Sequence, residues 1–74
     1  MSDGVILFHT TAMAMKAEKA LTRAGYPVRL VPTPREFSSD CGIALRFTIV
    51  GKDLVVGVLE SSGVELASIH EIKN

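Results

Sequence analysis

The chain has 74 residues, which is enough for one domain only, because a single hydrophobic core becomes marginal below about 70 residues. Apolar residues make up 47% of it and eight basic side chains balance eight acidic ones, which excludes disorder driven by charge or by low hydrophobicity. A net charge of zero and a pI near 6.7 lack the basic footprint of a nucleic-acid-binding domain. We therefore expect residues 1–74 to form a single domain with no nucleic-acid partner.

The first residues suggest where the protein works. Residues 1–4 carry no basic group, and the apolar run at residues 5–8 is too short for a signal peptide or a membrane span. We expect a cytoplasmic protein without a membrane partner. A single cysteine excludes an intramolecular disulfide framework, and two histidines add too few ligands for a zinc site, so we expect no metal and no cofactor. Aromatic residues make up only 5%, so a homodimer that extends the core is a reasonable expectation.

The first half of the chain predicts a strand, a helix and a strand. Residues 4–9 are a compact apolar run, typical of a short strand buried on both faces. Thr10 and Thr11 are good N-cap residues, and strong helix formers follow over residues 12–24 until Gly25. One stripe of this helix, expected to face a sheet, consists of Ala14, Ala17, Leu21 and Ala24. Residues 28–32 then alternate as a second strand that ends in prolines.

The second half predicts a strand, a helix and a strand. Large apolar side chains alternate with small or polar ones over residues 41–49, the clearest strand in the sequence. Residues 51–62 are predicted to form the second helix, because Leu54, Val55, Val58 and Leu59 recur at helical spacing. Residues 64–72 close the chain as a fourth strand.

This order predicts an α+β, ferredoxin-like βαββαβ fold, with a four-stranded antiparallel sheet and two helices on one face. The usual sheet order 4-1-3-2 makes the first and third strands antiparallel neighbours at the centre. The end of the first strand, at His9, then meets the start of the third, at Cys41. The start of the first helix and the exit of the second strand are expected at the same edge.

Cys41 is the residue with the clearest chemical potential. Thiolates rather than thiols attack sulfur, so a reactive cysteine needs a lowered pKa, which nearby cations or a helix amino end provide. The expected topology places Cys41 within reach of His9, Arg35 and the first helix. The adjacent carboxylate of Asp40 has the opposite effect, because a nearby negative charge raises the pKa of a thiol. Gly42 permits either a positive φ or the close approach of another molecule.

Structural explanations stand beside these functional ones. Free cysteines are among the most buried residues, so spacing alone favours Cys41 as a core filler. A histidine at the end of a strand, such as His9, is more often hydrogen-bonded to the backbone than used as an acid or a base. No residue near His70 in the sequence indicates a role for it. Arg46 lies between apolar residues and either extends over a surface without helices or holds an anion.

Longer stretches of the sequence point to a known family. Residues 8–11 and 16–21, the strand exit at 27–36 and above all the segment 38–47 resemble the "Putative Se/S carrier protein-like" family of small bacterial proteins. The resemblance covers nearly the whole chain. In this family pattern, segment 38–47 reads as "SSxCGxALRF", with Cys41 at its centre.

The resemblance implies a carrier. Cys41 would accept sulfur or selenium as a persulfide or perselenide from a donor protein and pass it to an acceptor protein, with His9 relaying a proton. The lack of a second cysteine fits, because a second thiol would discharge the persulfide into an internal disulfide. The activity implied is at most sulfur or selenium transfer. The binding residues implied are Gly42, Arg35, Arg46, Thr10 and Thr11.

A second class of function also fits the sequence. Domains of this size and predicted fold serve as regulatory, ligand-binding or protein-interaction modules, in which Cys41 would be structural. The glycines are scattered singly, without the spacing of a phosphate-binding loop, which argues against a nucleotide ligand. Reactivity of the thiol in the folded protein separates these hypotheses.

Overall fold

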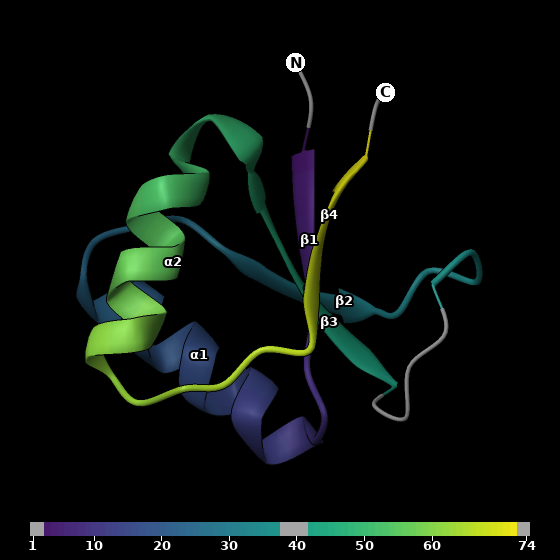
Figure 1. The fold of residues 1–74 in the computed structure, drawn as a ribbon, viewed down its shortest axis with the longest axis horizontal. Helices are drawn as coiled ribbons and strands as arrows, with labels where there is room; N and C mark the ends of the chain where they lie inside the picture. The colour runs from purple at the N-terminus through teal and green to yellow at the C-terminus, as the bar shows by residue number, and fades with distance from the viewer. Residues whose placement is uncertain (1–2, 38–41, 73–74) are drawn as a thin grey trace.

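The computed structural model describes residues 3–37 and 42–72, which contain four strands and two α-helices (Figure 1). In chain order, the elements are β1 (Asp3–Leu7), α1 (Thr11–Arg23), β2 (Arg29–Pro32), β3 (Ile43–Thr48), the short 3-10 helix η1 (Ile49–Gly51), α2 (Lys52–Ser61) and β4 (Ser68–Ile72). Neither of these α-helices is long and apolar enough to cross a membrane.

The strands form one sheet in the order β2-β3-β1-β4, and each pair of neighbours is antiparallel. The prediction of an α+β protein with a four-stranded antiparallel sheet and two helices is confirmed. β1 and β3 are neighbours at the centre of the sheet, with Leu7 opposite Ala44. The end of β1 therefore meets the start of β3, as expected.

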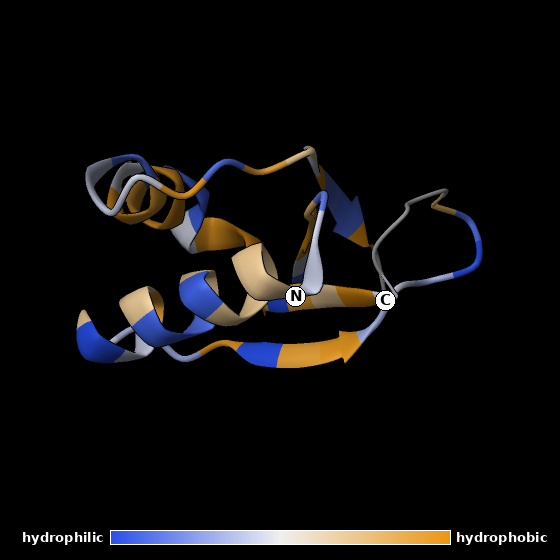
Figure 2. Ribbon diagram, turned by 90° about the horizontal axis from the view of Figure 1, so that it is seen from below, coloured by the Kyte–Doolittle hydropathy of each residue, from blue (hydrophilic) through white to orange (hydrophobic). Residues whose placement is uncertain are grey.

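Helix α1 begins where the sequence predicts. The Thr10 side-chain oxygen accepts a hydrogen bond of 3.2 Å from the Met13 amide, which satisfies one of the free donors of the first turn. Hydrophobic and hydrophilic residues alternate along its ribbon in Figure 2, as an amphipathic helix requires. Its buried residues are Ala14, Ala17 and Leu21. Ala24 was expected on this stripe but is exposed, because it is the C-cap and lies beyond the last helical residue, Arg23.

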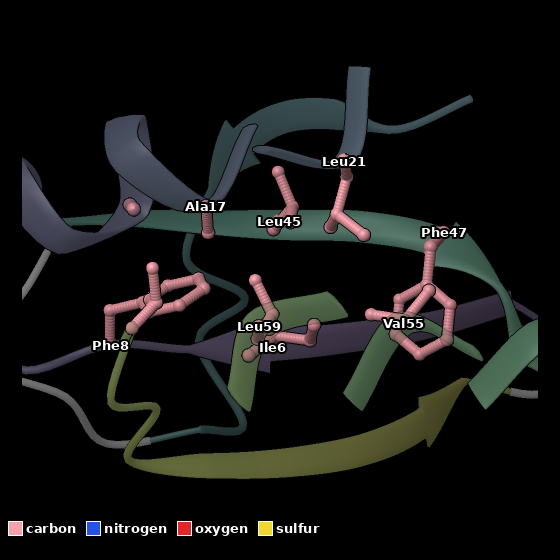
Figure 3. Close-up of a cluster of buried hydrophobic side chains, with 10 residues drawn as sticks. Ile6, Phe8, Ala17, Leu21, Leu45, Phe47, Val55 and Leu59 are labelled. Carbon is pink, nitrogen blue, oxygen red and sulfur yellow. The ribbon is translucent and has the colours of Figure 1, made fainter. Parts of the chain in front are cut away.

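Both helices cover the same face of the sheet, on one side in Figure 1. Val55 and Leu59 of α2 join the core formed by α1 and the sheet, together with Ile6 and Leu45 (Figure 3). Leu54 was expected on the apolar stripe of α2, but 67% of it is exposed. The face of α2 that contacts the core consists of Val55, Val58 and Leu59, and Leu54 lies outside it.

Strand β4 is shorter than predicted. The amide of Val64 donates to the carbonyl of Leu59 at 3.0 Å, so the chain first closes the end of α2 through Gly63, whose φ is +72°. Val64 is buried in the core, and pairing with β1 extends only from Ser68 to Ile72. The residues between them cross from the helix layer to the sheet.

Candidate functional site

Three segments meet at one end of the sheet. Pro32 lies opposite Ile43, and the Thr33 amide donates to the Gly42 carbonyl at 3.1 Å, so the exit of β2 adjoins the entry to β3. β1 ends at the same place and continues into His9. We call this the cysteine end, defined by His9, Thr33 and Gly42. Cys41 and Asp40 lie outside the described residues, and Gly42 marks where the chain leaves the cysteine.

The amino end of α1 also lies at the cysteine end. Thr10 is its N-cap and Thr11 its first residue, and both are exposed, as is His9. The first turn contains no acidic residue, so no carboxylate of that turn neutralises the positive end of the helix dipole. An anion near this helix end would be stabilised, which suits a thiolate or a persulfide anion.

Gly42 is exposed, and the described part of its surroundings is open. A Cβ atom built on Gly42 meets no atom of residues 3–37 and 43–72 within 4 Å. A positive φ is found at Gly25 and Gly63, at the ends of α1 and α2. Access for an approaching molecule at Gly42 stays a prediction.

The two arginines expected at the site lie in different places. Arg35 is exposed in a turn that the Phe37 amide closes by donating to the Pro34 carbonyl at 3.0 Å. Arg46 Nε donates a hydrogen bond of 2.7 Å to Asp3 Oδ2, and Arg46 Nη2 forms an ion pair with the same oxygen, also at 2.7 Å. Asp3 begins β1, at the far end of the sheet from Gly42, so the ion pair draws the Arg46 guanidinium away from the cysteine end. A role for Arg46 toward sulfur stays a prediction.

A contact that sequence reasoning missed joins the β2–β3 connection to β4. The rings of Phe37 and His70 stack with centroids 4.2 Å apart and an angle of 14° between their planes. His70 Nε2 also shares a hydrogen bond of 3.0 Å with Ser68 Oγ. The sequence offered little sign of this contact: Phe37 is an aromatic residue in a polar segment, and no neighbouring residue pointed to a role for His70.

Comparison with known proteins identifies the family. The model of the family described as "Putative Se/S carrier protein-like" matches residues 3–71, nearly the whole chain. The chain belongs to this family. The match includes Cys41 and all three segments of the cysteine end, and it confirms the resemblance noted in the sequence. No curated protein and no solved structure matches the chain.

Membership of a carrier family implies interaction with other proteins. As for metals, no group of three or more histidine, cysteine, aspartate or glutamate side chains gathers within residues 3–37 and 42–72. The chemistry that the described part of the site supports is therefore stabilisation of an anion at an open, solvent-facing edge.

Proposed function

We propose that this protein carries sulfur or selenium on Cys41 between a donor and an acceptor protein in the cytoplasm, on a ferredoxin-like βαββαβ domain. The observation that carries the proposal is the family match over residues 3–71 in a chain that has one cysteine. The exposed amino end of α1 and the open space at Gly42 support it.

The transfer needs no oxidant or reductant. The Cys41 thiolate attacks the outer sulfur of a persulfide on the donor, a new S–S bond forms, and the donor cysteine leaves as a thiolate. In the second step an acceptor thiolate attacks the outer sulfur on Cys41, and Cys41 leaves as a thiolate. A perselenide follows the same sequence with a selenium atom in the outer position. The single cysteine protects the cargo, because no second thiol of the chain can release it.

The residues of the cysteine end have distinct roles in this scheme. The amino end of α1, at Thr10 and Thr11, stabilises the anionic sulfur, and Arg35 adds a positive charge from the neighbouring turn. His9 takes up or returns the proton as the thiol ionises. Gly42 leaves room for the partner's cysteine.

Loading with a donor enzyme tests the proposal. The protein is incubated with a cysteine desulfurase and cysteine, and its intact mass is measured under non-reducing conditions. We expect wild type to gain the mass of one sulfur atom and Cys41→Ser to gain nothing; selenocysteine in place of cysteine shows whether selenium is accepted. A wild-type protein that gains no mass, and whose thiol alkylates only in denaturant, would contradict the proposal and favour a core cysteine.

Gly42→Ala provides a sharper test of access. An added methyl group meets no atom of the described residues within 4 Å, so we expect the variant to unfold at about the same urea concentration as wild type. We expect it nevertheless to load sulfur more slowly, because the methyl group stands beside the attacking thiolate. Gly57→Ala is the matched control: Gly57 is equally open but lies on α2, and its substitution should leave loading unchanged.

A further inference from the structure

A hollow of about 380 Å³ lies on the sheet at the end away from the cysteine end, beside the starts of β1 and β2 and the end of β3. Its polar lining comes from Asp3, Arg29, Arg46 and Thr48. Arg46 lies directly opposite Arg29, so these two side chains share one face of the sheet. Leu45, the preceding residue on β3, packs into the core with both helices, so the arginines lie on the other face.

The two arginines of the hollow are only partly neutralised. Like charges directly opposite each other destabilise a sheet, and Arg29 and Arg46 stand in this relation. Asp3 compensates one of them: its Oδ2 atom contacts Nε and Nη2 of Arg46, whereas Nη1 takes part in neither contact. Within residues 3–37 and 42–72, Arg29 is exposed and forms no ion pair. The lining of the hollow therefore has a net positive charge.

The wall of the hollow beside Arg29 is apolar. Pro27 and Val31 precede and follow Arg29 by two residues each, and both line the hollow. Val31 also packs against the buried cluster that contains Val5, and the ring of Pro27 fixes the φ angle of its own backbone. A ligand with a hydrocarbon part would therefore find a preformed apolar surface next to the guanidinium groups.

We propose that this hollow binds a small organic carboxylate, whose oxygens bridge Arg29 and Arg46 while its hydrocarbon part lies against Pro27 and Val31. The planar fork of N–H donors on a guanidinium matches a carboxylate in shape. The net charge of the lining suits one negative charge, and the apolar wall favours an organic anion over inorganic phosphate. Binding would also relieve the repulsion between the two arginines. This site is separate from the cysteine end and does not depend on the proposed carrier function.

Titration with isovalerate, followed by NMR on isotope-labelled protein, tests the site. Isovaleramide is the control ligand, because it has the same shape without the charge. We expect isovalerate to shift the amide signals of the lining residues on β2 and β3, with an affinity in the millimolar range, and isovaleramide to leave them in place. Phosphate should bind more weakly than isovalerate. Absence of shifts at the hollow, equal shifts with isovaleramide, or phosphate that binds as tightly as isovalerate would overturn the proposal.

Arg29→Gln removes one half of the bridge. Its affinity for isovalerate should fall about tenfold, because a charge-assisted hydrogen bond is lost. Arg29→Lys keeps the charge but not the fork, and should recover only part of the affinity. Arg23→Gln is the matched control: Arg23 is an exposed arginine at the end of α1, outside the hollow, and its loss should leave the affinity unchanged. Equal weakening by Arg23→Gln and Arg29→Gln would mean that isovalerate responds only to net charge, and would overturn the site.

Urea unfolding separates loss of the site from loss of the fold. Without isovalerate, Arg29→Gln should unfold at the same urea concentration as wild type or at a higher one, because the repulsion from Arg46 is gone. With isovalerate, the midpoint of wild type should rise, and that of Arg29→Gln should rise much less. An Arg29→Gln protein that isovalerate stabilises as much as wild type would contradict the bridge.

Discussion

Gly51 lies beneath the Tyr26 side chain, and this contact leads to a quantitative prediction for Gly51→Ala. Gly51 is buried at the junction of η1 and α2, with φ −93° and ψ 16°, values that alanine also adopts. A Cβ atom here would overlap the hydroxyl and ring of Tyr26, and even the third-nearest atom, Cε2, would lie 2.8 Å away. The cost of the substitution is therefore steric and not conformational.

The size of the effect follows from what must move. Tyr26 packs against the main core, so its ring cannot avoid the new methyl group without giving up apolar contact. Overpacking of this kind costs about 1–3 kcal/mol, and displacement of a whole ring puts Gly51→Ala in the upper part of that range. Gly57→Ala is the matched control: the position is exposed, open and inside α2, so alanine should stabilise the protein by about 0.5–1 kcal/mol.

Urea unfolding, followed by circular dichroism, measures the free energy of unfolding of both variants. The midpoints can be compared directly only if this free energy depends on urea concentration with the same slope in each protein. Gly51→Ala should unfold at lower urea than wild type and Gly57→Ala at higher urea. In a Tyr26→Ala background the penalty of Gly51→Ala should largely disappear, because the clashing ring is gone. A Gly51→Ala protein as stable as wild type, or a penalty that persists without Tyr26, would refute the packing argument.

Three further predictions concern the cap, the ion pair and the core. Thr10→Ala removes the cap of α1 and should cost about 1 kcal/mol in a urea titration, whereas Thr10→Ser should cost little. Asp3→Asn breaks the pair with Arg46, whose side chain is 41% exposed, so the loss should stay below about 1 kcal/mol and shrink as salt is added; a large, salt-independent loss would argue against this view. Leu45→Ala leaves a cavity between the sheet and both helices and should cost about 2–5 kcal/mol by calorimetry, and a loss well under that range would mean that the core collapses around the gap.

The sequence alone determined the order of the helices and strands and pointed to Cys41 as the candidate reactive residue. The Thr10 cap, the stop at Gly25 and the alternation through β3 are local signals, because capping, backbone preference and side-chain period depend on a few consecutive residues. The predicted strand and helix positions agree with the structure except at the ends, most of all at the start of β4. Cys41 and its family followed from residue identity, which needs no coordinates.

Only the tertiary structure decided which distant side chains meet. Asp3 pairs with Arg46 and Phe37 stacks on His70, and each contact depends on strand register and on the path of the β2–β3 connection. The exposure of Leu54 likewise depends on how α2 lies against its neighbours. Periodicity shows that a strand has two faces but not what covers each of them, because cover is set by segments far away in the chain.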